Sequence, residues 1–301
     1  MRSALGTVIW PYSWPEEHEL GQLVARCRTL QTRLIVLDQT GRLPHPGQIA
    51  PGMNGVRCYS LSQSEYDGYD VAMHVLQRGH RRAAFLTHEA RAPWSRRRQD
   101  GVLSAFAAYG ETRGIRQLPS VRDPVIFRSP EVVAFMNAHD EFLKSHGLAV
   151  QGASSLPTKP YQFVADEAVR DFFLRSAMAK QLEPVFERAL ADRRTTVWIC
   201  ASDDIAFAAL HFLSARKARV PADISLVGFD DSRLAMHYRF SSYNFNMHGL
   251  AAEMVDWILR GSTRRENGTV RRVEGFVNDR GTVATNTRRA AGALPGPVQG
   301  R

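Results

Sequence analysis

Acidic residues follow two short apolar segments in the second half of the chain. Thr196–Ala201 precedes a Ser-Asp-Asp triplet, and Ser225–Phe229 precedes the pair Asp230 and Asp231. Apolar runs of this length, rich in β-branched and aromatic residues, are typical of strands covered on both faces. Because open α/β sheets bind ligands beyond the carboxyl ends of their parallel strands, Asp230 is our strongest candidate for a ligand-binding residue. The structural alternative for Asp230 is a helix cap or a salt bridge at a turn.

The triplet after the first apolar segment has a different interpretation. Ser202 is expected to be the N-cap of a helix, with Asp203 and Asp204 in its first turn, where carboxylates oppose the positive end of the helix dipole. We interpret Asp203 as a structural residue that caps the helix. Ser202 is a candidate ligand contact through its hydroxyl, which can donate and accept a hydrogen bond.

Other residues at expected strand ends could complete a site for a polyhydroxylated ligand. Such a ligand needs carboxylates that accept from its hydroxyls, an arginine that donates, and aromatic faces against its C–H surfaces. The further candidates for this site are Arg98, Trp94, Asp38, Trp10 and Phe245. Arg98 could instead be a solvated arginine on a helix face, and Trp94 could serve only in packing.

The acidic pairs could also be considered for hydrolysis. Catalytic carboxylates of glycosidases oppose each other about 5–9 Å apart, whereas adjacent carboxylates in one short segment diverge. The chain contains no G-x-S-x-G nucleophile motif. Cys27, Cys58 and Cys200 lack metal-ligand spacing and are interpreted as small buried thiols. We therefore predict no catalytic residue, no metal and no cofactor, with a carboxylate-based hydrolase as a remote alternative.

Three blocks of sequence, in a fixed order, resemble one protein family. They are C-A-S-D-D-x-A with V-P-x-D-I-S-L-V-G-F-D-D (Cys200–Asp231), H-V-L-Q-R-G-H-R-R-A-A-F-L with W-S-R-R-R-Q-D-G (His74–Gly101), and N-D-R-G-T (Asn278–Thr282). Together they resemble the effector-binding domain of LacI/GalR transcription regulators. The resemblance covers residues 60–290 well and residues 5–59 loosely.

This resemblance implies an α/β fold of the type I periplasmic-binding-protein kind, with two doubly wound parallel-sheet lobes joined by crossover strands. It implies a homodimeric, non-enzymatic sensor that closes on a sugar or nucleobase-like effector and reaches operator DNA through a helix-turn-helix head. Arg98 precedes Gly101 by three residues, as does the effector-contacting arginine of the family. Ser202 stands where the family usually has asparagine, so effector recognition is expected to differ. The alternative function is the solute-binding protein of a sugar transporter.

The expected first lobe comprises residues 1–59 and 246–269. The second comprises residues 60–245 and 270–289, with an insertion at about 110–165, and residues 290–301 are expected to be a disordered tail. The first expected strand, Gly6–Trp10, begins almost at the first residue. Since the family has two strands and a helix-turn-helix before such a strand, we expect an N-terminally truncated first lobe without a DNA-binding head.

Periodicity predicts further elements. Helices are expected at Glu16–Thr29, Tyr69–Arg78, Arg96–Tyr109 and Pro130–His146, and strands at Leu34–Leu37, Arg82–Leu86 and Val270–Phe276. Gly114–Ser129 is expected to be irregular, and Met236–Asn246 to be a crossover segment.

Composition limits the partners of the chain. The net charge is +9 over 301 residues, but it comes largely from scattered arginines, and runs such as Arg96–Arg98 are too short to form a nucleic-acid groove. We therefore expect these residues alone to bind DNA weakly and without sequence preference.

No apolar run approaches the roughly 20 residues that cross a bilayer, and the N-terminus lacks a signal-peptide core. The cytoplasm is the expected location, with no membrane partner.

Overall fold

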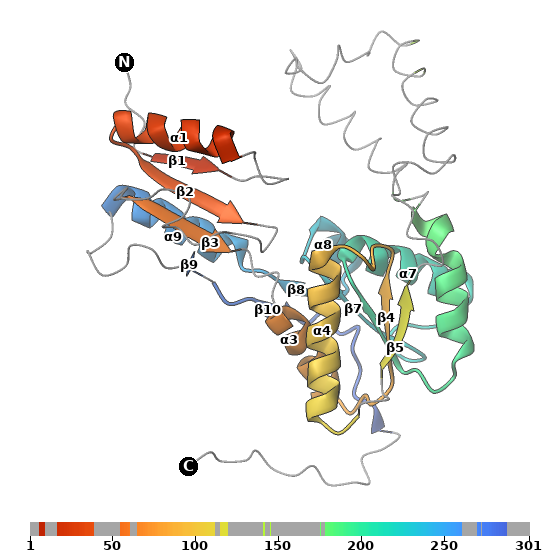
Figure 1. Cartoon of the computed structure of the whole chain (residues 1–301). Coiled ribbons are helices and arrows are strands. Elements are labelled where there is room, and N and C mark those ends of the chain that lie inside the picture. The colour runs from red at the N-terminus through yellow and green to blue at the C-terminus, as the bar shows by residue number, and fades with distance from the viewer. Residues whose placement is uncertain are drawn as a thin grey trace, which may run out of the picture.

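The computed structural model describes residues 6–9, 17–38, 55–60, 65–111, 115–119, 141, 145, 175, 178–260, 270–271 and 273–287. These residues form two separate sheets, one of four strands and one of six strands (Figure 1). In the order of the described strands, the chain passes from one sheet to the other after β3, after β8 and after β9. The sheets are the cores of two lobes, as the sequence predicted.

The first sheet is entirely parallel. Its strands are β1 (Gly6–Ile9), β2 (Arg33–Asp38), β3 (Val56–Ser60) and β9 (Val270–Arg271), in the order β1-β2-β3-β9. Helix α9 (Met247–Arg260) lies beside β3 in Figure 1 and packs Leu250, Met254 and Trp257 on Ile35, Leu37 and Tyr59. Because side chains alternate along a strand, Leu34 and Val36 of β2 point to the opposite face, the one available to helix α1 (Glu17–Thr29).

The second sheet has the order β10-β8-β7-β6-β4-β5, with only β10 antiparallel. Its strands are β4 (Ala83–Thr87), β5 (Ile115–Pro119), β6 (Val197–Cys200), β7 (Ser225–Phe229), β8 (Ser241–Asn244) and β10 (Phe276–Asn278). Its helices are α3 (Glu65–Gln77), α4 (Pro93–Ala108), α7 (Asp203–Ala215), α8 (Arg233–Tyr238) and a helix over residues 178–191.

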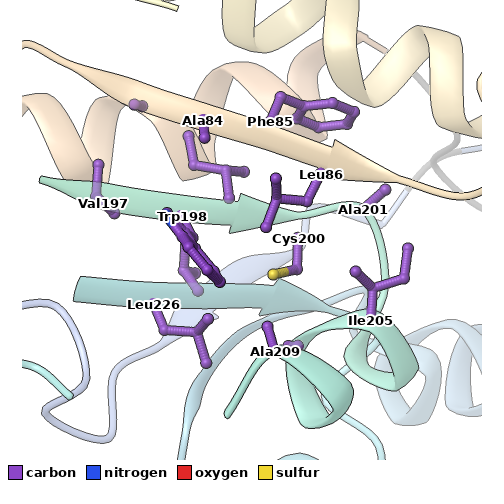
Figure 2. Close-up of a cluster of buried hydrophobic side chains, with 14 of the residues drawn as sticks. Ala84, Phe85, Leu86, Val197, Trp198, Cys200, Ala201, Ile205, Ala209 and Leu226 are labelled. Atoms are coloured by element: carbon purple, nitrogen blue, oxygen red, sulfur yellow. The ribbon is translucent and has the colours of Figure 1, made fainter. Parts of the chain in front are cut away.

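The central strands of this sheet are buried on both faces. Figure 2 shows Ala84, Trp198 and Leu226 side by side across three strands. The Trp198 ring is stacked with Phe186, 5.8 Å between centroids, and with Phe212, 6.3 Å between centroids. Burying aromatic side chains of this size stabilises a fold by about 1.5–3 kcal/mol each. This packing fixes the strand ends from which the candidate site is built.

Several expected elements are confirmed and others are corrected. The helices α1, α3 and α4 and the strands β2, β4, β6 and β7 occur where the sequence predicted them, within a few residues. Gly114–Ser129 is not wholly irregular, since Ile115–Pro119 pairs with β4 along its length. Met236–Asn246 is not simply a crossover segment, because it contains β8, a strand paired with β7.

The single strand predicted over Val270–Phe276 is wrong. The structure has two short strands there, and they belong to different sheets: β9 pairs with β3, and β10 pairs with β8. Residue 270, expected in the second lobe, therefore lies in the first sheet. The predicted helix Pro130–His146, most of the insertion at 110–165 and the tail 290–301 lie outside the described residues. Within the described part of the chain, no helix has the length and apolar character to span a bilayer.

Candidate functional site

The candidate site lies at the carboxyl ends of β4, β6, β7 and β8 in the second lobe. Helix α4 carries the central residue, Arg98, and is held close to α3 by glycines. A Cβ atom on Gly68 would overlap the carbonyl of Arg98, and one on Gly101 would overlap the carbonyl of Glu65. The absence of side chains at these two positions lets the helix backbones touch. This contact fixes the backbone position of Arg98, from which its side chain reaches the strand ends.

Arg98 is buried and extends its guanidinium across the strand ends. Its Nη1 donates to the carbonyl of Ala201, 2.5 Å away, just after β6. Its Nη2 donates to Oδ1 of Asp230, 3.0 Å away, just after β7. Nε is buried and has no hydrogen-bond partner within the described residues. The planar guanidinium thus joins two strand ends through its Nη1 and Nη2 atoms, while its Nε–H has no partner among the described residues.

Three aromatic rings enclose this guanidinium. The centroids of Trp94, Phe229 and Phe245 each lie 4.9 Å from Cζ of Arg98. Phe245 is in turn packed edge-on against Tyr243 of β8, with 5.2 Å between centroids. Aromatic faces attract a cation at this distance and offer flat apolar surfaces to a ligand. The site therefore combines a cation, a carboxylate and aromatic walls.

Asp230 and Asp231 adopt unusual backbone conformations. Their φ angles are +105° and +46°, a region that side-chain-bearing residues rarely occupy. The strand ladder holds them there, since the amide of Asp230 donates to the carbonyl of Tyr243 (2.9 Å) and that of Asp231 to Oγ of Ser242 (3.0 Å). Strained residues of this kind cluster at functional sites.

The two carboxylates have different surroundings. Asp231 accepts from the side-chain amides of Asn244 (2.7 Å) and Asn278 (3.2 Å) and lies 2.6 Å from Nη2 of Arg280, with 6% of its side chain exposed. The side chain of Asp230 is 39% exposed and pairs with Arg98. Burial raises the pKa of Asp230 because it disfavours the charged carboxylate, and the charge of Arg98 opposes this rise. Of the two carboxylates, that of Asp230 is the more exposed to solvent.

Asp203 stabilises the turn after β7 through hydrogen bonds to its carboxylate. Its carboxylate accepts from the amide of Ser232 (2.7 Å) and from the hydroxyl of Ser242 (2.6 Å). A Cβ atom on Gly228 would overlap Oδ1 of Asp203, so the glycine of the V-G-F-D-D segment makes room for this carboxylate. Burial, followed by the charge of Asp230, raises the pKa of Asp203 to about 7. The predicted structural role of Asp203 is confirmed, but its carboxylate stabilises the turn after β7 instead of capping α7.

The outcome for the predicted site residues differs from one residue to the next. The structure brings Arg98, Asp230, Trp94 and Phe245 together. The hydroxyl of Ser202 accepts from the amide of Ile205 (3.4 Å), which confirms the predicted N-cap, and its role as a ligand contact stays a prediction. Asp38 ends β2 in the first sheet, with its side chain outside the description, and Trp10 lies outside the described residues.

One residue of the site was missed in the sequence. Phe229 was interpreted only as the last residue of a buried strand, yet its ring packs on Arg98. Among the described residues no group of three or more His, Cys, Asp and Glu side chains could hold a metal ion.

Comparison with known proteins agrees with this architecture. Residues 140–283 match the family model of the periplasmic binding protein-like domain. No curated protein matches the chain. A LacI transcriptional regulator from a Rhodococcus species shares 19% identity at a TM-score of 0.52, covering 91% of this chain and 76% of the other.

Two further solved structures are similar. A LacI family regulator from Enterococcus faecium with bound ribose shares 15% identity at a TM-score of 0.51, covering 88% of this chain and 76% of its own. A sugar-binding regulator of the LacI family from Escherichia coli, complexed with phosphate, shares 16% identity at a TM-score of 0.52, with coverages of 94% and 78%. Residues 140–283 thus resemble a periplasmic binding protein-like domain, and the two parallel-sheet lobes have the fold found in solved LacI family regulators.

Proposed function

We propose that this chain is the effector-binding unit of a LacI-type transcription regulator and that its effector is a sugar or a similarly small polar metabolite. The observation that carries this proposal is the Arg98–Asp230 pair, enclosed by Trp94, Phe229 and Phe245 at the carboxyl edge of a parallel sheet. An acceptor, a donor and flat apolar walls within one site are the elements that recognise a polyhydroxylated ring.

The chemistry of each group suggests its role toward such a ligand. Asp230, being partly exposed, accepts hydrogen bonds from ligand hydroxyls. Arg98 donates to ligand oxygens, for which its Nε is uncommitted within the described residues. Trp94 and Phe245 pack against the faces of the ring, and Ser202 adds a hydroxyl near the Arg98 bond to Ala201. A nucleobase-like ligand would use the same aromatic walls for stacking.

Closure of the two lobes is the proposed response to the effector. The three passages of the chain between the sheets are the segments about which such a motion would take place. Asp38, the last residue of β2, and Trp10, which follows β1 in the sequence, are proposed to contribute to the site from the first lobe. In a homodimer, closure would shift the lobes relative to the partner and alter how attached helix-turn-helix heads span operator DNA in the cytoplasm.

We also propose that the chain is not an enzyme. The Asp203 carboxylate is occupied by the amide of Ser232 and the hydroxyl of Ser242, and Asp231 is occupied by two asparagines and Arg280. These carboxylates hold the turn after β7 in place. Asp230 is paired with Arg98 and Asp204 with Arg175, so each of the four carboxylates in the two acidic pairs already has a partner among the described residues, unlike the catalytic carboxylates of hydrolases.

A thermal-shift screen tests the proposal. The protein is heated with a panel of pentoses, hexoses, disaccharides, sugar acids and nucleosides, with D-ribose among them, and the hits are repeated with Asp230→Ala and Arg98→Ala. We expect at least one compound to raise the Tm of the wild type, and both variants to lose that shift. Asp223→Ala, which removes an exposed carboxylate paired with Arg219, is the matched control and should keep it. Equal shifts in the wild type and both site variants would refute the assignment.

A further inference from the structure

The last residue of β8 is an asparagine whose side chain is bonded at both of its polar atoms. Nδ2 of Asn244 donates to Oδ2 of Asp231, 2.7 Å away, in the turn after β7. Oδ1 of Asn244 accepts from the amide of Asn246, 2.6 Å away. Asn244 therefore joins the turn that carries Asp230 to the segment that leaves the second sheet for helix α9.

The second of these bonds shapes the backbone around Phe245. A side-chain oxygen of asparagine that accepts from the amide two residues later forms an Asx turn, which bends the chain locally. The residue enclosed by this turn is Phe245, whose ring centroid lies 4.9 Å from Cζ of Arg98. The side chain of Asn244 thus holds one aromatic wall of the site and is bonded, through Asp231, to the turn that bears the carboxylate of the site.

Asn246 continues the connection into the first lobe. Its Oδ1 accepts from the amide of Gly249 (3.1 Å), and its carbonyl accepts from the amide of Leu250 (3.0 Å), so Asn246 caps helix α9. Leu250 is buried among the side chains of the first sheet. The φ angle of Asn246 is +53°, a left-handed conformation that asparagine tolerates better than most residues. The first turn of α9 and the Asx turn at Phe245 therefore share one residue.

The neighbouring segment between the lobes is bonded to the same residues. Nδ2 of Asn246 donates to the carbonyl of Glu274 (3.3 Å), just before β10. The side-chain amide of Asn278, at the end of β10, donates to Asp231 (3.2 Å). Both segments, the one after β8 and the one before β10, are thus connected by hydrogen bonds to the turn after β7.

We propose that Asn244 is a positioning residue that couples the candidate site to the first lobe: its side chain makes the placement of Phe245 and of the Asp230–Asp231 turn depend on the start of α9. The part concerning ligands rests on the proposed function. The coupling between Asp231 and α9 does not, and the two parts are tested by separate measurements.

The first measurement needs no ligand. Asn244→Asp keeps an acceptor for the amide of Asn246 but sets a second carboxylate against Asp231, so an effect on α9 must come through Asp231. Adding Asp231→Asn restores a donor and an acceptor between the two positions. Amide hydrogen exchange over residues 245–251 should become roughly tenfold faster in Asn244→Asp and return to within about threefold of the wild type in the double variant.

Exchange over residues 203–215 of α7 serves as the internal reference for any global loss of stability. Unchanged exchange at the start of α9 in Asn244→Asp would overturn the proposal, because Asn244 would then act only on its own turn. A double variant that does not recover would also overturn it. The double variant must show this recovery even if Asn244→Asp alone does not fold.

The second measurement uses whichever sugar or nucleoside shifts the wild type in the screen above, by isothermal titration calorimetry. Asn244→Asp should weaken its binding roughly tenfold, since Phe245 and the turn bearing Asp230 lose their connection, and the double variant should regain most of that loss. Equal binding by the wild type and Asn244→Asp would refute the part concerning ligands. Asp223→Asn, which neutralises an exposed carboxylate paired with Arg219, is the matched control and should change neither readout. If no compound binds the wild type, the proposed function fails, and hydrogen exchange still decides the coupling.

Discussion

Nη2 of Arg98 lies 3.0 Å from Oδ1 of Asp230, although the two residues are 132 positions apart in the sequence. Each is placed by a different constraint: Arg98 by the glycine contacts between α3 and α4, and Asp230 by the left-handed turn at the end of β7. The same guanidinium also binds the carbonyl of Ala201. Arg98 therefore joins α4, β6 and β7 at one point. Its substitution should lower the free energy of unfolding as well as weaken ligand binding.

Arg98→Lys tests whether the planar fork is needed in addition to the charge. An ammonium cannot reach Ala201 and Asp230 in the same geometry, and it packs less well on three aromatic rings. We expect the free energy of unfolding to fall by about 1–3 kcal/mol, measured by urea denaturation. Arg219→Lys, at an exposed pair with Asp223, is the control and should leave the urea midpoint unchanged. An unchanged midpoint for Arg98→Lys would show that any cation suffices at this position.

Gly228→Ala tests the contact between β7 and Asp203. The added methyl would overlap Oδ1 of Asp203 and approach Cβ of Ala206 to 3.2 Å, so we expect a loss of about 1–3 kcal/mol in the free energy of unfolding. Asp203→Ala removes the overlapping oxygen. The double variant should therefore be more stable, by at least about 1 kcal/mol, than the sum of the two single losses predicts. Additive losses would mean that the methyl is accommodated elsewhere.

Much of the second lobe was predictable because its local signals agree with its tertiary structure. Thr196–Ala201 and Ser225–Phe229 are almost wholly apolar and form central strands buried on both faces, and Ser202 caps the following helix as its side chain suggests. The edges were not predictable in this way. Ile115–Pro119 has polar residues at Arg116 and Gln117 and ends in proline, a composition that only an edge strand tolerates.

The candidate site was predictable only in part, for a similar reason. Asp230 was identified because it follows an expected buried strand, and Arg98 because its segment resembles the family's effector-contacting segment. Trp94 and Phe245 were identified because aromatic residues stand near expected strand ends. Phe229 was missed because a phenylalanine at the end of an apolar run carries no sign of which neighbour it meets. Sheet register, which no local pattern contains, turns it toward Arg98.

The raised pKa of Asp203 predicts a pH dependence of stability. Its carboxyl titrates near 7 in the folded protein and near about 3.9 when unfolded, so between these values the folded state binds more protons. The contribution of Asp203 to stability is therefore greatest below about pH 4 and is lost as the pH rises through about 7. Asp203→Asn, which cannot ionise, should gain stability relative to the wild type between pH 5 and pH 8, by on the order of 2 kcal/mol.

Comparing the two proteins at each pH isolates this group. His74, whose pKa is lowered to about 4 by burial and by the charge of Arg78, gives stability that rises with pH up to about 6.5, but it does so in both proteins. Urea unfolding at pH 5, 6, 7 and 8 gives the difference directly. If the free energies of unfolding of the two proteins change in parallel from pH 5 to pH 8, Asp203 is already ionised at pH 5 in the folded protein.

Gly101→Ala tests the contact that positions Arg98, and two physical effects predict opposite signs. Alanine is the better helix former, so propensity alone would stabilise α4 by about 1 kcal/mol. The added methyl, however, would overlap the carbonyl of Glu65 in α3 and force the helices apart, at a cost of about 1–3 kcal/mol. We expect the steric effect to dominate, with a lower urea midpoint and a smaller ligand-induced thermal shift, since Arg98 would move away from Asp230. Ser104→Ala, on the exposed face of the same helix, reports propensity alone and should be neutral or slightly stabilising. A gain in stability from Gly101→Ala comparable to that control would show that α3 and α4 do not meet at this glycine.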